Sequence, residues 1–176
     1  KNISTLDIGN NRLTDIGITG LFKSFPKAPK LFELFASLLN IRDEIIEKIT
    51  PSLKGSNLYK LYLGTNLISD IGVLKLCSGI EKINYLHLNN NLVTDEGIKY
   101  LAQVLPSITV KLLNLHMNKI TDQAMQILGE ALSQNKEIFT LDLSYNLITK
   151  NGVFDLLMNI GHRSRLKKLN LQYNQI

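Results

Sequence analysis

The chain has 176 residues, of which 44% are hydrophobic and 20% charged, with 4 Pro and 11 Gly, so the composition indicates one folded domain and excludes a disordered or collagen-like chain. No run approaches the roughly 18 apolar residues of a membrane span. The single cysteine, Cys77, excludes a disulfide scaffold and favours a reducing compartment, and a net charge of +5 falls short of a nucleic-acid signature unless the charges cluster.

One sequence pattern repeats along the whole chain. The pattern apolar-x-x-Leu-x-Leu-x-x-Asn-x-apolar recurs at steps of 25 to 28 residues. A fixed period of this length is typical of solenoids, whose units stack because none can bury its apolar face alone. We therefore expect residues 1–176 to form a single domain of about seven repeats, with the last repeat incomplete. The units begin near Ile3, Leu31, Leu58, Ile83, Val110, Ile138 and Leu166.

Each unit is predicted to begin with a short strand, because its fourth and sixth positions are apolar and alternate with polar or variable residues. In chain order these strands centre near residues 7, 35, 62, 87, 114, 142 and 170. Asn occupies the ninth position of every unit except the second, which has Leu39 there, so the amides are expected to bond the backbone of a turn and the second unit to bend less regularly.

A helix is predicted after each of the first six turns. Thr or Ser followed by Asp, as at Thr94 and Asp95, supplies side chains that accept from the free amides of a first turn. Apolar residues then follow at spacings of three and four, which is one buried helical stripe. Cys77 falls on an inward position of this stripe and is expected to be a buried, inert thiol; other units carry Phe22, Thr50, Ala102, Gly129 and Leu157 there.

Stacking of such units predicts the architecture. Strands lie about 4.8 Å apart and helices about 8 to 10 Å apart, so the stack must curve with the strands inside. The expected fold is an α/β solenoid, a horseshoe with a concave parallel sheet and convex helices.

Leu-x-x-Leu-x-Leu-x-x-Asn-x-Leu, followed by Thr-Asp-x-Gly and Leu-Ala-x-x-Leu, resembles the ribonuclease-inhibitor type of leucine-rich repeat. The likeness covers nearly the whole chain, and the unit from Ile83 through Leu105 matches it almost letter for letter. The Lys-, Asn- and Ile-rich texture further resembles secreted effectors of intracellular bacterial pathogens. The resemblance implies a partner protein held on the concave face, and likeness to the ribonuclease inhibitor implies that binding blocks an enzyme's active site.

The candidate partner-binding residues are those between the leucines, at positions three, five, seven and eight of each unit. Aromatic rings and histidines gather there, and an exposed sheet has no folding reason to carry so many, whereas interface centres are enriched in them. The alternative is that the rings cover the sheet by packing on each other across strands. The candidates are Phe35, Lys60, Tyr62, Tyr85, His87, Asn114, His116, Asp142, Tyr145, Lys168 and Tyr173.

Other chemistry finds less support. His116 and Ser144 on adjacent strands could form a nucleophile and base, but Asp142 lies on the serine's own strand and no oxyanion hole is evident. His87, His116 and Asp142 lack the short spacing of metal ligands. The basic run His162, Arg163, Arg165, Lys167 and Lys168 is expected to be a solvated loop or, alternatively, a contact for an acidic surface. Mixed charge on the concave face opposes a nucleic-acid groove.

The sequence thus predicts a non-catalytic, cytoplasmic protein-binding module that is monomeric alone and takes no cofactor or metal. By resemblance it is an effector or regulator that blocks a partner enzyme, with delivery into a host cytosol as one route. A second possibility is the recognition domain of a longer sensor or ubiquitin-ligase-type adaptor. A hydrolase built on His116 and Ser144 is a third.

Overall fold

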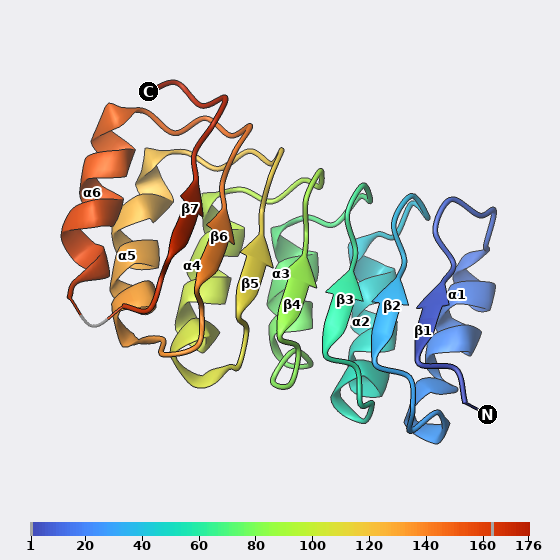
Figure 1. Ribbon diagram of the computed structural model, residues 1–176. Helices are drawn as coiled ribbons and strands as arrows, with labels where there is room; N and C mark the ends of the chain where they lie inside the picture. The colour runs from blue at the N-terminus through green and yellow to red at the C-terminus, as the bar shows by residue number, and fades with distance from the viewer. Residues whose placement is uncertain (1, 163) are drawn as a thin grey trace.

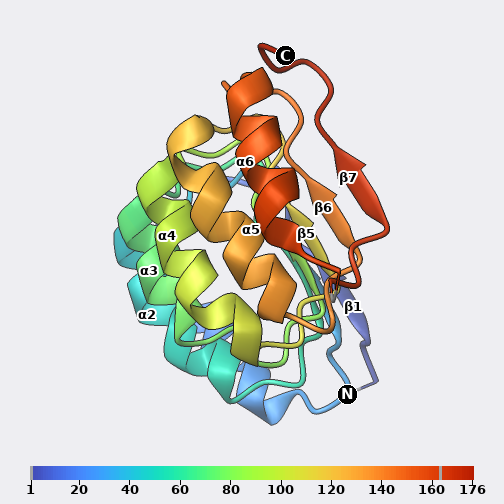
Figure 2. The ribbon, with the colours of Figure 1, turned by 90° about the vertical axis from the view of Figure 1, so that its left-hand side faces the viewer.

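A computed structural model describes residues 2–162 and 164–176. In these residues seven parallel strands form one sheet in the order β1 to β7, and each strand pairs in register with the next. Figure 1 shows the strands side by side with the helices behind them, and Figure 2 shows all helices on one side of the sheet. The strands are β1 Thr5–Asp7, β2 Glu33–Phe35, β3 Lys60–Tyr62, β4 Tyr85–His87, β5 Leu112–Asn114, β6 Thr140–Asp142 and β7 Lys168–Asn170.

A helix follows each of the first six strands. These helices are α1 Asp15–Phe22, α2 Asp43–Lys54, α3 Asp70–Cys77, α4 Asp95–Val104, α5 Met125–Gln134 and α6 Lys150–Ile160. Short 3-10 turns lie at η1 Phe25–Lys27, η2 Leu105–Ser107 and η3 Asp122–Ala124. The predicted solenoid with an inner parallel sheet and outer helices is confirmed.

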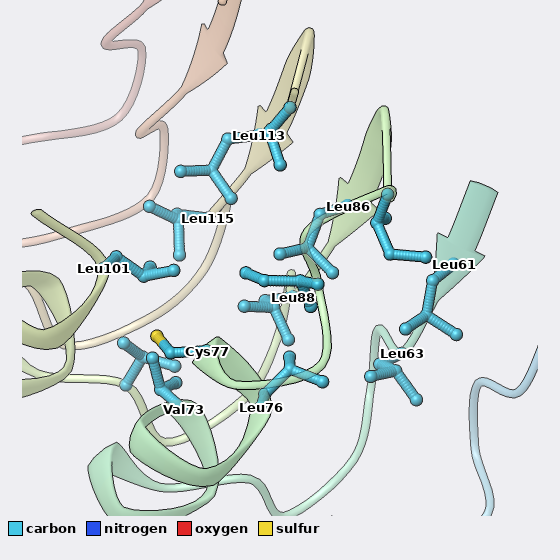
Figure 3. Packing of buried hydrophobic residues seen from close by; sticks show 14 of the residues in the cluster. Leu61, Leu63, Val73, Leu76, Cys77, Leu86, Leu88, Leu101, Leu113 and Leu115 are labelled. Carbon is cyan, nitrogen blue, oxygen red and sulfur yellow. The ribbon is translucent and has the colours of Figure 1, made fainter. Parts of the chain in front are cut away.

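The core lies between the sheet and the helices. The central leucine of each inner strand is buried, and so is the apolar residue that follows the strand. Figure 3 shows these side chains, such as Leu86 and Leu88, directed toward the helical residues Leu76 and Leu101. Burial of one such side chain contributes about 1.5 to 3 kcal/mol, so the leucine columns that define the repeat also supply its stability.

The recurring asparagines join neighbouring units. Asn91 donates its amide to the carbonyls of Leu63 and Leu88, and its oxygen accepts from the amide of Ile68. The second unit differs as expected: Leu39 is buried in place of Asn, and both Leu38 and Asn40 have a positive φ.

The recurring aspartates act between units rather than within their own helix. Thr94 caps its own helix α4, but the carboxylate of Asp70 accepts from the Thr94 amide, the Thr94 hydroxyl and the amide of Gly97 in the next unit. A Cβ on Gly97 would lie 2.6 Å from that carboxylate, which explains why glycine stands there.

The two ends of the stack expose apolar side chains. Leu157 was predicted to face inward as Cys77 does, and this is wrong: it is 58% exposed, because α6 is the last helix in the part of the chain that the structure describes. Phe154 and Met158 are exposed beside it. None of the described helices is long and apolar enough to cross a membrane.

Candidate binding surface

The first and third residues of the strands, with the turn that follows each strand, form the inner face of the sheet, here called the concave surface. The side chains of a strand alternate, so these residues point away from the buried leucines. On β2 to β6 they are half-buried, with the middle residue buried. All eleven candidate residues lie on this surface: eight on strands, His116 two residues after β5, and Tyr145 and Tyr173 in turns.

Three rings on adjacent strands stack face to face. Phe35 and Tyr62 have ring centroids 4.1 Å apart at an angle of 9°, and Tyr62 and His87 are 4.4 Å apart at 21°. The in-register pairing of β2, β3 and β4 places these residues side by side, which sets the spacing. This ring stack is the cross-strand packing that the sequence left as an alternative, and it turns the ring edges toward solvent.

Burial in the stack changes the acid–base behaviour of two members. Burial raises the pKa of the Tyr62 hydroxyl, with the positive charge of Lys60 acting against it. Burial lowers the pKa of His87, with the negative charge of Asp142 acting in the opposite direction. Both groups are therefore favoured in their neutral forms, and the stack presents an uncharged centre.

A salt bridge and two tyrosines lie beside the stack. The Nζ atom of Lys60 is 2.7 Å from Oε1 of Glu33, and both side chains are about three-quarters covered. The same Nζ lies 5.5 Å from the ring centroids of Tyr59 and Tyr85, within the range of a cation–π interaction. Hydrogen bonding to Glu33 raises the pKa of Lys60. Lys60 is thus held and neutralised by its neighbours.

Asn114 connects the ring stack to the rest of the surface. Its amide nitrogen lies 3.4 Å from Nδ1 of His87, and its oxygen accepts from the backbone amide of His116. The structure therefore brings the candidates from Phe35 to His116 into one continuous row.

Beyond Asn114, four polar side chains form a cluster. Nδ1 of His116 is 2.8 Å from Oγ of Ser144, and that hydroxyl donates to Oδ1 of Asp142 at 2.5 Å. Asn170 donates to both Asp142 and Ser144. Ser144 lies on the concave surface with these residues but is only 2% exposed, because the side chains bonded to its hydroxyl cover it.

The proton pattern of the cluster does not suit nucleophilic catalysis. A carboxylate only accepts hydrogen bonds, so the single proton of the Ser144 hydroxyl points at Asp142. Nδ1 of His116 must then donate to the same oxygen, and a nitrogen that carries a proton is not a base for that hydroxyl. Asp142 therefore orients the serine and not the histidine.

Two tyrosines border the cluster. Tyr145 and Tyr173 stack with centroids 4.2 Å apart, and His116 meets Tyr145 edge-on at 5.0 Å. Both tyrosines have a positive φ, of 54° and 55°, a conformation that the eighth position of every unit shares. They are 43% and 69% exposed, the most accessible aromatic rings of the surface.

The remaining candidate, Lys168, stands apart at the edge strand β7, where it is exposed beside Thr140. In the basic run, Arg165 donates to the carbonyl of Lys136 and His162 is exposed, whereas Arg163 lies outside the described residues. Sequence reasoning missed the second position of each unit, which borders the surface with Phe32, Tyr59, Lys111, Phe139 and Lys167. The concentration of large and charged residues in that column was the available signal.

Neither a metal centre nor a reactive thiol emerges from the geometry. In residues 2–162 and 164–176 no group of three or more His, Cys, Asp or Glu side chains lies close enough to hold a metal ion. Cys77 is buried as predicted, and burial raises the pKa of its thiol to about 11. A thiol with this pKa is a poor nucleophile at neutral pH.

Comparison with known proteins agrees with the fold. A sequence-family model described as leucine-rich repeat matches residues 1–22 and 81–102. The crystal structure of an internalin from Listeria monocytogenes superposes with a TM-score of 0.58 over 95% of this chain and 47% of that one, at 22% identity, which supports the fold alone. With the seven-fold repeat, these findings make the chain a leucine-rich repeat protein.

Two relatives in sequence belong to longer proteins. NACHT, LRR and PYD domains-containing protein 9C of Mus musculus is 34% identical over 144 residues, which are 77% of this chain and 14% of that protein. FERM domain-containing protein C of Dictyostelium discoideum is 32% identical over 98 residues, 53% of this chain and 7% of that protein. The chain thus matches about a seventh or less of either relative's length.

Proposed function

We propose that this chain is a non-catalytic protein-binding module whose concave surface holds a partner protein. The observation that carries the proposal is the row of ring edges from Phe35 through His87, continued by Tyr145 and Tyr173. Rings fixed against each other lose little further freedom on binding, and aromatic residues dominate the centres of interfaces. Leucine-rich repeat domains are generally protein–protein interaction modules.

The charge of the surface indicates the kind of partner. Lys60 is paired with Glu33, and the Asp142 carboxylate accepts from Ser144 and Asn170, so polar and aromatic groups dominate the centre. We expect a partner with a neutral or mildly acidic cleft that accepts tyrosine and histidine side chains. Coverage of such a cleft by a stiff arc would block an enzyme's active site without chemistry by the chain itself.

The proton pattern around Ser144 supports the non-catalytic assignment, because the hydroxyl donates to Asp142 and His116 is not its base. The proposal treats residues 1–176 as a single domain of seven repeats, the last incomplete, that is monomeric alone. The buried single cysteine supports a cytoplasmic location. The role of a bacterial effector delivered into a host cytosol rests on the Lys-, Asn- and Ile-rich texture of the sequence.

A second candidate is the recognition region of a longer sensor or adaptor. It is favoured by the size of the relatives: the chain corresponds to 14% of a mouse protein whose name records NACHT and PYD domains besides its repeats. In this case the concave surface still binds the partner, but other parts of the longer chain act on it.

The test compares three forms of the chain in affinity capture from cell lysates, followed by affinity measurement with each captured protein. The variant Tyr62→Ala/Tyr85→Ala removes two rings from the concave surface, and Tyr100→Ala removes a half-buried ring from helix α4 on the outer side. We expect the double variant to lose about 2 kcal/mol or more of binding free energy while Tyr100→Ala binds as the wild type does. Equal retention by all three forms would refute the concave surface as the binding site.

A further inference from the structure

A cavity lies at the edge of the sheet where the chain enters strands β4 to β7, the lower edge of the sheet in Figure 1. Its volume is about 580 Å³, which falls in the range of sites that hold a small ligand or a few side chains. Tyr85, Phe139 and Leu166 supply the apolar part of its lining. Tyr85 also belongs to the concave surface, so the cavity and that surface are continuous.

The cavity also carries positive charge. Lys111, Arg165 and Lys167 line it, and Glu137 is the one carboxylate among the described lining residues. None of the ion pairs found between described residues uses any of these three cations. The Arg165 guanidinium donates to the Lys136 carbonyl at 3.3 Å, which holds it at the rim. The cavity therefore gathers three positive charges against one carboxylate, and none of the three forms an ion pair with a described residue.

The positions of these residues follow from the repeat. Lys111, Phe139 and Lys167 occupy the same place in three successive units, directly before β5, β6 and β7. Their backbones are hydrogen-bonded to one another, since Phe139 donates to Lys111 and Lys167 donates to Phe139. Two cations are thus fixed on either side of one aromatic ring by the rigid edge of the sheet.

We propose that this cavity binds an acidic segment of a partner protein, with carboxylates against Lys111, Arg165 and Lys167 and an apolar side chain against Phe139. Carboxylates gain charge-assisted hydrogen bonds from lysine and arginine. Glu137 and the apolar lining residues favour a peptide over a nucleic acid, because a nucleic acid places repeated phosphates along a track of one sign. The proposal rests on the proposed function, since it supplies a second contact for the same partner.

The probe is a fluorescent peptide, Glu-Glu-Phe-Glu-Glu, compared with its counterpart in which Gln replaces every Glu. We expect saturable binding of the acidic peptide at low salt, weakening at high salt, and no binding of the Gln peptide. Lys111→Gln/Lys167→Gln should weaken binding about fivefold, as expected for the loss of two charge contacts at the protein surface. The matched control Lys119→Gln/Lys150→Gln removes the same charge from exposed residues that follow β5 and β6, and it should leave binding unchanged.

Carbodiimide coupling provides the second readout, because it joins a peptide carboxylate to a contacting lysine amine as an amide. Coupling at Lys111 and Lys167, found by mass spectrometry, is the expected result. Absence of saturable binding, equal loss in both double variants or coupling spread over Lys119 and Lys150 would overturn the proposal. Binding of an RNA oligonucleotide or of phosphatidylserine vesicles through these lysines, without peptide binding, would overturn it as well.

The variant Tyr62→Ala separates this proposal from the proposed function, because its ring does not line the cavity. If the concave surface is wrong and the cavity right, Tyr62→Ala keeps both the partner and the peptide. If the cavity is wrong, the peptide fails to bind to the wild type whatever the concave surface does.

Discussion

The recurring asparagines at the ninth position of the units allow a stability prediction in which the same substitution, Asn to Ala, is compared at a buried and at an exposed position. Asn118 lies inside the stack and is 9% exposed. Its amide donates to the carbonyls of Leu88, Leu115 and His116, and its oxygen accepts from the amide of Val93. The substitution Asn118→Ala removes all four contacts without changing the leucine columns.

The magnitude follows from what each lost partner retains. The Leu88 carbonyl keeps a bond from Asn91, and the Leu115 carbonyl keeps one from Asn146. The amide of the buried Val93 loses its side-chain acceptor. A net bond contributes about 1 kcal/mol and an orphaned buried donor costs about 1 to 3 kcal/mol, so Asn118→Ala should lower the free energy of unfolding by about 2 to 4 kcal/mol.

Asn11 is the matched control. It holds the same place in the first unit but is exposed, and its amide donates only within its own turn, to Ile8 and Gly9. Asn11→Ala should therefore cost about 1 kcal/mol or less. Urea unfolding followed by circular dichroism measures both values. Equal losses in the two variants would show that the bonds between units do not carry the stability assigned to them.

Three further predictions concern single residues. Burial lowers the pKa of His87 in the folded chain, so the unfolded chain binds a proton at this residue more readily, and the free energy of unfolding should fall as the pH drops below 6.5 and through the lowered pKa. The difference in that free energy between about pH 8 and about pH 5, measured by urea unfolding, should be smaller in His87→Gln than in the wild type. Iodoacetamide at about pH 8 should label Cys77 only after unfolding, because burial raises the thiol pKa to about 11; rapid labelling of the folded chain would contradict this. Gly97→Ala should lower Tm because the new Cβ meets Asp70 at 2.6 Å, whereas Gly17→Ala, with its nearest contact at 3.5 Å, should raise it slightly, and thermal melts that rank the two in the opposite order would refute this reading of the glycines.

The fold was predictable because its signal is repeated. One leucine at a fixed position is weak evidence, but Leu34, Leu61, Leu86, Leu113 and Leu141 recur at nearly constant steps, and the structure buries all five. Periodicity of two and then of three to four within each unit fixes strand, helix and inner face together. The identity of the residues on the inner face followed from the same count.

Contacts between units were harder to predict, because they depend on side-chain direction. Asp70 follows a capping Ser69, which suggests a role in its own helix, yet its carboxylate bonds Thr94 and Gly97 of the next unit. Nor did the spacing indicate that Phe35, Tyr62 and His87 turn their faces to one another. A pattern of residues gives the place of a side chain but not its rotamer.

The second unit shows how such contacts determine which part of the stack is held least firmly. Arg42 stands where later units carry a capping hydroxyl, and no side-chain cap bond forms there, so Asp15 lacks the hydroxyl partner that Asp70 finds in Thr94. Leu39 stands where later units carry the recurring asparagine at the ninth position. The junction between the first two units therefore lacks both kinds of bond among the described residues, and strand pairing, apolar contact and the bond from the Asn57 amide to the Pro29 carbonyl remain. Local opening begins where such bonds are fewest. The ring stack begins at Phe35 in the second unit, and its rings lie on β2, β3 and β4, so opening of the first unit leaves the ring stack and the strands that carry it in place.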